Sequence, residues 1–139
     1  MPHRMTEALV ARYNEAWNRH DLEEILALHS PDMVFENHTA DERVGGEQVR
    51  RHIEDIFARW PDLAFATRRL RACATAAVCE WTARATHARP VPAGDRVLPP
   101  TGRRLEWRGV DVFTLDDGRI ARKDVYSDRM GLMRQLGAL

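Results

Sequence analysis

An alternating stretch from Leu105 to Leu115 carries a single acid, Asp111, within an otherwise apolar set of residues. Successive side chains of a β-strand point to opposite sides, so the odd-numbered residues of this stretch share one face. An ionised carboxylate that is buried on such a face without a partner is costly. The stretch is therefore expected to be a strand whose acid finds a cationic partner, changes its pKa or lines a cavity.

The partner of Asp111 depends on the turn that follows. A three-residue loop over 116–118 places Lys123 opposite Asp111 on the returning strand. A two-residue turn at 117–118 moves the register by one residue and places Asp124 there instead, which makes a carboxylate pair with one raised pKa. The sequence leans only mildly toward the first register. A structural acid held by Lys123 or by a backbone donor, and a functional acid, are equally good interpretations of Asp111.

The composition excludes several classes of protein. The 139 residues fit one domain, 1–139, that is large enough to bury a core. The 21 basic and 21 acidic residues cancel, which argues against a nucleic-acid partner or an anionic membrane surface. No apolar run suggests a membrane span and the N-terminus lacks a signal-peptide core, so a cytoplasmic location is expected.

Motifs that hold metals or cofactors are missing from the sequence. Cys73 and Cys79 lack metal-ligand spacing and are expected to be reduced packing residues. There is no zinc signature, no Gly-rich phosphate loop and no nucleophile elbow. Chemistry without a metal or cofactor is therefore expected.

Hydrophobic periodicity predicts helices first and strands later. Helices are expected over 6–20 with Thr6 as N-cap, from a capping box at 21–24, over 47–59, and after Asp128. Strands are expected over 33–38, 63–73, 77–87, 105–115 and 119–128, with a loop over 39–46 and a flap or mouth-lining loop over 88–104.

This order predicts an α+β fold, a cone-shaped curved antiparallel sheet with helices packed on its concave face. The convex face carries Val110, Val112 and Tyr126, which predicts a homodimer that covers it. The concave face is expected to enclose a cavity, lined by Trp17, Asn37, Trp81, Asp111, Lys123 and Val125.

Short motifs along nearly the whole chain support one resemblance. They include Tyr13-Asn-Glu-Ala-Trp-Asn-Arg-His-Asp21, Pro31-Asp-Met-Val-Phe-Glu-Asn37, Gly109-Val-Asp-Val-Phe113, Asp117-Gly-Arg-Ile120 and Tyr126-Ser-Asp128. In this order and spacing they resemble the SnoaL-like polyketide cyclase family of the nuclear transport factor 2-like superfamily. The resemblance implies the cystatin-like α+β barrel of that superfamily. It also favours the three-residue loop, with Lys123 and Val125 facing inward.

The resemblance implies acid/base chemistry with departures in the residues. The aldol-type cyclases use a His on the penultimate strand and an Asp on the last strand, where this chain has Asp111 and Val125. Limonene epoxide hydrolases are similar at Phe35 and Asn37, positions at which they hold the attacking water. Ketosteroid isomerases of this fold move a proton with one carboxylate in an apolar cavity.

Two hypotheses follow. In the first, the chain is a cofactor-free enzyme that cyclises, isomerises or hydrolyses a small hydrophobic polyketide- or steroid-like substrate. Asp111 is then the acid/base, Lys123 tunes it or stabilises an oxyanion, and Asn37 orients substrate or water. In the second, the fold binds a small hydrophobic ligand or assembles as a dimer, and the two charged residues are a buried ion pair. The substrate-binding residues are expected to be Tyr13, Trp17, Phe35, Trp81, His87, Trp107, Val125 and Ser127.

Overall fold

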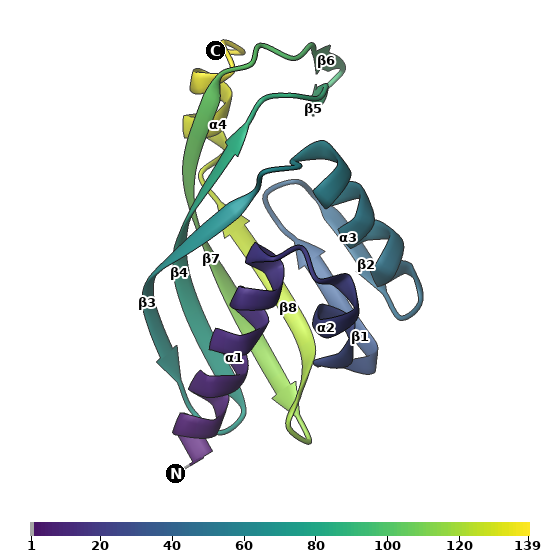
Figure 1. Cartoon of the computed structure of the whole chain (residues 1–139), viewed down its shortest axis with the longest axis vertical. Coiled ribbons are helices and arrows are strands. Elements are labelled where there is room, and N and C mark those ends of the chain that lie inside the picture. The colour runs from purple at the N-terminus through teal and green to yellow at the C-terminus, as the bar shows by residue number, and fades with distance from the viewer. Residues whose placement is uncertain (1) are drawn as a thin grey trace.

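The computed structural model describes residues 2–139. It contains a curved six-stranded sheet that is covered on one side by helices (Figure 1). The strands lie in the order β2-β1-β8-β7-β4-β3, and a separate hairpin, β5-β6, lies beside α4 at one end. The elements are α1 (Pro2–Asn18), α2 (Leu22–Ala27), β1 (His29–Asn37), β2 (Glu42–Gly45), α3 (Gln48–Arg59), β3 (Ala64–Ala72), β4 (Ala76–Thr86), β5 (Val91–Ala93), β6 (Arg96–Leu98), β7 (Arg104–Asp116), β8 (Arg119–Ser127) and α4 (Arg129–Gln135).

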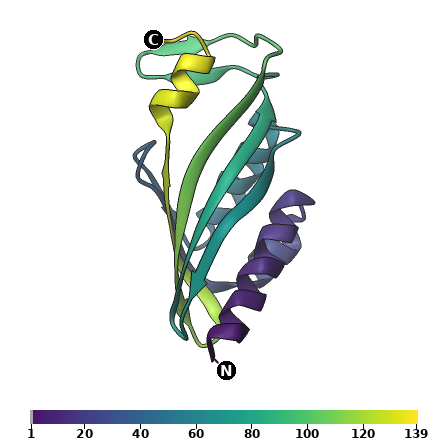
Figure 2. The ribbon, with the colours of Figure 1, turned by 90° about the vertical axis from the view of Figure 1, so that its left-hand side faces the viewer.

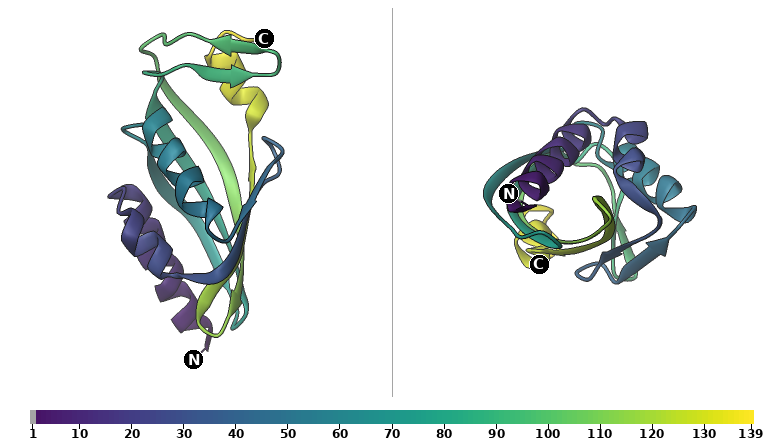
Figure 3. Two further views of the ribbon diagram at one scale, coloured as in Figure 1. Left: turned by 90° about the vertical axis from the view of Figure 1, so that its right-hand side faces the viewer. Right: turned by 90° about the horizontal axis from the view of Figure 1, so that it is seen from below.

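The predicted α+β architecture is confirmed. The sheet bends strongly along its length and α1, α2 and α3 lie against its concave side (Figures 2 and 3). All neighbouring strands are antiparallel except β1 and β8, which run parallel and are separated in the chain by α3 and by the six strands β2 to β7. Irregular pairing within β1–β8, β3–β4 and β7–β8 accompanies the bending, as β-bulges do.

The turn between β7 and β8 differs from the predicted three-residue loop. Asp116 pairs with Arg119, so the turn consists of Asp117 and Gly118 alone. Both have positive φ, 51° and 73°, which is the geometry that a two-residue hairpin turn of the primed type requires. The three-residue loop is therefore wrong.

A bulge next to this turn sets the register that matters for Asp111. Ala121 has no partner on β7, and beyond it Phe113 pairs with Lys123 and Asp111 with Val125. Neither predicted partner, Lys123 or Asp124, lies directly opposite the acid. The extra residue restores the alternation that the shorter turn would have reversed, so the inward orientation of Lys123 and Val125 is confirmed.

Two element boundaries differ from the predicted ones. Helix α1 begins at Pro2, not after Thr6, since proline with its fixed φ is well suited to the first helical position. Strand β1 begins at His29, which pairs with Ile120 on β8.

The predicted loop over 39–46 contains β2, and the flap over 88–104 contains the β5–β6 hairpin.

Two predicted helix caps are confirmed. The Asp21 side chain accepts a hydrogen bond from the backbone N–H of Glu24 at 3.2 Å, which starts α2. Asp128 accepts one from Gly131 at 2.9 Å and starts α4. No helix in the described residues 2–139 is long and apolar enough to cross a membrane.

The convex face of the sheet is partly apolar. Val78 is 40% exposed and Tyr126 is 45% exposed, while Val110 and Val112 are half-buried. The ring of Tyr126 stacks on His38 with 4.4 Å between ring centroids. Association of two chains through this face stays a prediction.

Candidate functional site

A cavity of about 570 Å³ lies on the concave side of the sheet. Its walls include Trp81 and Trp107 from the central strands and Ile56 from α3. Met133 of α4 also lines it. Pro92 of the β5–β6 hairpin lines it too, so the segment over 88–104 contributes to the cavity wall, as the sequence predicts. These two elements lie together at one end of the sheet, at the top of Figure 1.

Asp111 and Lys123 meet on the wall of this cavity. They lie diagonally on neighbouring strands, and Lys123 Nζ is 3.8 Å from Asp111 Oδ2. The two residues are 5–6% exposed, so little solvent reaches either charge. The distance permits a strong electrostatic interaction but is too long for a hydrogen bond.

Burial changes the proton affinity of both groups. The apolar surroundings raise the pKa of Asp111, while the Lys123 charge and the Trp81 indole oppose that change. Burial likewise lowers the pKa of Lys123, and the Asp111 charge opposes it. Each shift favours the uncharged form, so the carboxyl can hold or release a proton closer to neutral pH than an exposed aspartate can.

Aromatic rings surround the lysine amine. Nζ of Lys123 lies 4.1 Å from the ring centroid of Trp17, 4.9 Å from that of Phe35 and 5.0 Å from that of Tyr13. Phe113 lies farther away, at 5.9 Å. Ring faces attract a cation, and they take the place of part of the water that a charged lysine loses on burial.

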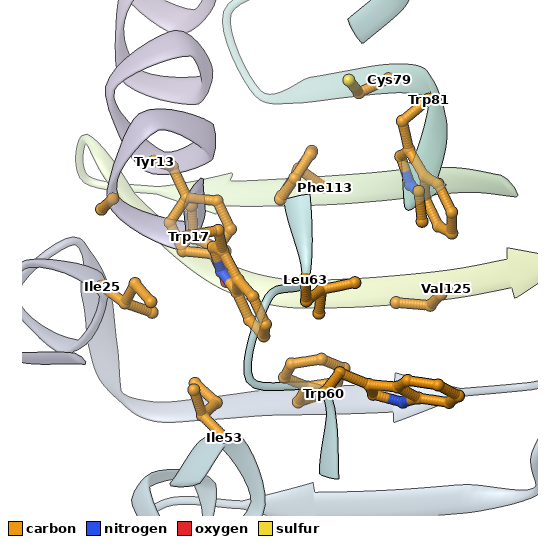
Figure 4. Close-up of a cluster of buried hydrophobic side chains, with 14 of the residues drawn as sticks. Tyr13, Trp17, Ile25, Ile53, Trp60, Leu63, Cys79, Trp81, Phe113 and Val125 are labelled. Atoms are coloured by element: carbon orange, nitrogen blue, oxygen red, sulfur yellow. The ribbon is translucent and has the colours of Figure 1, made fainter. Parts of the chain in front are cut away.

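Two indole nitrogens are buried next to the cavity. Neither Trp17 Nε1 nor Trp81 Nε1 makes a hydrogen bond of normal geometry within the described residues, although the Trp81 indole is close enough to Asp111 to lower the pKa of its carboxyl. Both tryptophans line the cavity. The Trp81 ring rests on Gly109, its partner on β7, where any Cβ would collide with the indole. Both nitrogens are closed to a molecule of the size of water, so neither reaches a ligand in the cavity unless its ring moves. Figure 4 shows Trp17 and Trp81 in the buried cluster, with Phe113 drawn between them.

Most of the substrate-binding residues expected from the sequence reach the cavity. The exceptions are Tyr13 and His87, which are fully buried and do not line it, so a contact of either residue with a substrate stays a prediction. Tyr13 hydrogen-bonds His29 at 2.9 Å, and His87 hydrogen-bonds Thr101 at 2.9 Å. The residues that do line the cavity are Trp17, Phe35, Asn37, Trp81, Trp107, Asp111, Lys123, Val125 and Ser127.

The structure also brings in a residue that the sequence analysis missed. His52 of α3 lines the cavity and its ring packs edge-on against Phe35, with 5.0 Å between centroids. Burial lowers the pKa of His52. The signal was its spacing, because His52 follows Val49 by three residues and precedes Ile56 by four, which places all three on one helix face.

One group of potential metal ligands lies outside the cavity. Carboxylates of Glu36 and Asp124 and the ring of His38 have ligand atoms within 4.8 Å of one another. Arg122 donates hydrogen bonds to both carboxylates, at 2.5 Å and 2.8 Å, and so supplies the positive charge there. The arrangement is accounted for as a surface charge network.

Comparison with known proteins agrees with this fold. Residues 10–123 match the family model for the SnoaL-like domain. No curated protein sequence is significantly similar to the chain. The structure is similar to AclR from Streptomyces galilaeus, provisionally assigned as a hydroxylase, with 28% identity, a TM-score of 0.80 and coverage of 96% of this chain and 85% of that chain.

Two further structures are similar in fold. A SnoaL-like protein from Jannaschia sp. CCS1, provisionally assigned as a polyketide cyclase, has 19% identity, a TM-score of 0.84 and coverage of 99% of this chain and 94% of that one. IdmH from Streptomyces antibioticus, with the same provisional assignment, has 24% identity, a TM-score of 0.79 and coverage of 97% and 99%. At these identities the two similarities show the fold alone.

Proposed function

The chain belongs to the SnoaL-like domain family, and from that premise we propose that it moves a proton on a small, largely apolar carbonyl compound held in the cavity. The single observation that carries the proposal is the buried Asp111 carboxyl on the cavity wall, whose pKa burial raises. A base with such a pKa is suited to removing a proton next to a carbonyl near neutral pH.

The cavity supplies a donor for the oxygen of that carbonyl. When a carbon next to a carbonyl loses its proton, negative charge develops on the oxygen, and donors fixed in a dry site stabilise that charge. Lys123, whose Nζ lies 3.8 Å from Asp111 Oδ2, is the donor on this wall. Asp111 would remove the proton and return it elsewhere on the substrate, which is an isomerisation or the first step of an aldol-type cyclisation.

The volume and the lining of the cavity support a small substrate with both apolar and polar parts. A volume of about 570 Å³ lies within the range of roughly 300–1,000 Å³ that small-molecule sites occupy. Tryptophan, phenylalanine and leucine side chains contribute to the lining, and the charged residues Asp41, Glu42, Arg59 and Arg129 also line it. Polyketide- and steroid-like compounds combine an apolar skeleton with a few oxygens and match this distribution.

Proton exchange on a model ketone tests the proposal. The protein is incubated with 2-tetralone in D₂O, and incorporation of deuterium next to the carbonyl is followed by NMR. General acid/base catalysis contributes about 10²–10⁴ in rate, so Asp111→Asn is expected to lose at least about 10²-fold. Asp116→Asn, the same change at an exposed position of β7, is the matched control and should keep the full rate. Equal rates for Asp111→Asn and the wild type would contradict the proposal.

A further inference from the structure

Lys123 is the only lysine of the chain, and the other 20 of its 21 basic residues are arginines. We propose that Lys123 forms a Schiff base, through Nζ, with an aldehyde or ketone bound in the cavity. This chemistry requires an amine that can lose its proton and attack a carbonyl carbon. Arginine cannot do so, because its guanidinium stays protonated in proteins.

The position of the amine fits a covalent site. Lys123 lines the cavity and is yet only 5% exposed, so Nζ meets a molecule in the cavity rather than bulk water. It sits over the face of Trp17, at 4.1 Å from the ring centroid, and beside Phe35 at 4.9 Å. These rings also line the cavity, so a ligand that reaches Nζ would lie against them.

The aromatic rings and the carboxyl group of Asp111 around Nζ suit an iminium ion better than they suit an ammonium ion. An ammonium has three N–H donors, and the carboxylate of Asp111 is 3.8 Å away, beyond hydrogen-bond range. A protonated Schiff base has one N–H and a charge spread over nitrogen and carbon. It would keep the attraction to the rings and to Asp111 while leaving fewer buried donors without an acceptor.

Burial also prepares the amine for attack. The pKa of Lys123 is lowered because the charged form loses its water, which increases the fraction of neutral amine. Each unit by which the pKa falls raises that fraction about tenfold at neutral pH, starting from a pKa of about 10.4 in an unfolded chain.

Asp111 is placed to move the protons that the reaction needs. The neutral amine attacks the carbonyl carbon, the carbon–oxygen π bond opens, and a proton passes from nitrogen to oxygen to give a carbinolamine. The Asp111 carboxylic acid then donates its proton to the hydroxyl group, which leaves as water as nitrogen forms the second bond to carbon. The products are an iminium ion, a carboxylate and one water, so atoms and charges balance.

This inference deepens the proposed function, because it rests on the same cavity binding a carbonyl compound. It adds the covalent bond and a substrate requirement: the carbonyl must be an unhindered aldehyde or ketone, not an ester or amide. An iminium also withdraws electrons more strongly than a ketone does, so the adjacent proton is lost more easily.

Reductive trapping tests the Schiff base directly. Wild-type protein is incubated with 2-tetralone and sodium cyanoborohydride at pH 7, and the adduct is located by mass spectrometry of proteolytic peptides. The chain has one lysine, so the α-amino group is the other aliphatic amine that can react. We expect the adduct at Lys123, formed at least tenfold faster in the folded chain than in the urea-unfolded chain. Modification of the α-amino group alone, or equal rates at Lys123 in the two states, would overturn the proposal.

Two variants separate the roles in this reaction. Lys123→Arg keeps the cation and should lose the adduct at position 123 completely. Asp111→Asn keeps the amine but cannot supply the proton for loss of water. At a pH at which the amine is neutral in both proteins, we expect trapping to slow at least tenfold in this variant, with a changed pH profile. Unchanged trapping in Asp111→Asn would overturn the part assigned to the acid.

The same samples distinguish this inference from the proposed function. Deuterium exchange on 2-tetralone without any adduct at Lys123 would overturn the Schiff base and leave proton transfer by Asp111 in place. An adduct without exchange would support the Schiff base and contradict the proposed proton transfer.

Discussion

Lys123 reaches Asp111 diagonally across the β7–β8 pair, with Nζ 3.8 Å from Oδ2, although the backbone partner of Asp111 is Val125. The bulge at Ala121 produces this arrangement by adding one residue to β8. Diagonal neighbours on one sheet face are farther apart than direct partners, and a long side chain such as lysine bridges that gap. The pair therefore depends on the bulge as much as on the two side chains.

Removing one member of the pair should destabilise the fold more than removing both. Asp111→Asn or Lys123→Met leaves one buried charge without its partner, which costs about 3–5 kcal/mol in comparable cases. The double variant leaves neither charge and is expected to unfold within about 1 kcal/mol of the wild type. Urea denaturation of the four proteins measures this coupling, and additive single effects would show that the charges do not interact.

Ligand binding separates the enzyme hypothesis from a purely structural pair. A compound that binds the folded protein raises its melting temperature by mass action. If 2-tetralone and larger apolar ketones bind beside the pair, their stabilising effect should fall in Asp111→Asn. A large coupling energy together with no ligand-dependent shift in melting temperature would favour the structural role alone.

Acid should destabilise the protein through His29. Burial, with a smaller effect of the Lys123 charge, lowers the pKa of His29 from 6.5 to about 3. The unfolded chain therefore binds a proton at His29 between pH 6.5 and 3 while the folded chain does not. Stability is fully present above pH 6.5 and falls as the pH drops toward 3, by about 4 kcal/mol at most.

His29→Gln removes this titration while keeping a polar side chain beside Tyr13. Its stability should vary less with pH than that of the wild type between pH 6.5 and 3. Denaturant unfolding at several pH values gives the two curves. His3→Gln, a change outside the core, is the control and should follow the wild type. Parallel curves for His29→Gln and the wild type would show that His29 is protonated in the fold.

Gly109 keeps the Trp81 indole in place. A Cβ at position 109 would collide with Cη2 and Cζ2 of that ring and lie 2.9 Å from the carbonyl oxygen of Tyr126. Gly109→Ala is expected to cost about 1–3 kcal/mol, as overpacking typically does, and to move the Trp81 indole N–H signal in NMR spectra. At Gly45 an added Cβ meets its nearest atom at 3.6 Å, so Gly45→Ala is the matched control. An unmoved Trp81 signal in Gly109→Ala would contradict this packing.

Much of the fold follows from the sequence because periodicity reports which face of an element is buried. The alternation through Ala77, Cys79 and Trp81 predicts the inner face of β4, and all three are buried. The capping residues Asp21 and Asp128 mark the starts of α2 and α4. Such signals depend on residues that are close to one another in the sequence, so they can be found without knowledge of the tertiary structure.

The remaining features depend on long-range pairing. The bulge at Ala121 and the parallel pairing of β1 with β8 involve residues far apart in the chain, and the residues near the bulge do not signal it. Tyr13 and His87 lie on inward faces, as predicted, but hydrogen bonds to His29 and Thr101 hold them in the core. A face can be predicted from periodicity, whereas the depth of a side chain beneath a cavity wall cannot.

The proton affinity of Lys123 is the most direct test of a reactive pair buried in the cavity. Because the chain has one lysine, protein labelled with ¹³C- and ¹⁵N-lysine gives a single side-chain signal, which is followed in a pH titration by NMR. We predict a pKa below the ordinary 10.5, and a still lower pKa in Asp111→Asn, since that change removes the carboxylate that raises it. A lysine that titrates at or above 10.5 and is indifferent to Asp111→Asn would contradict the account.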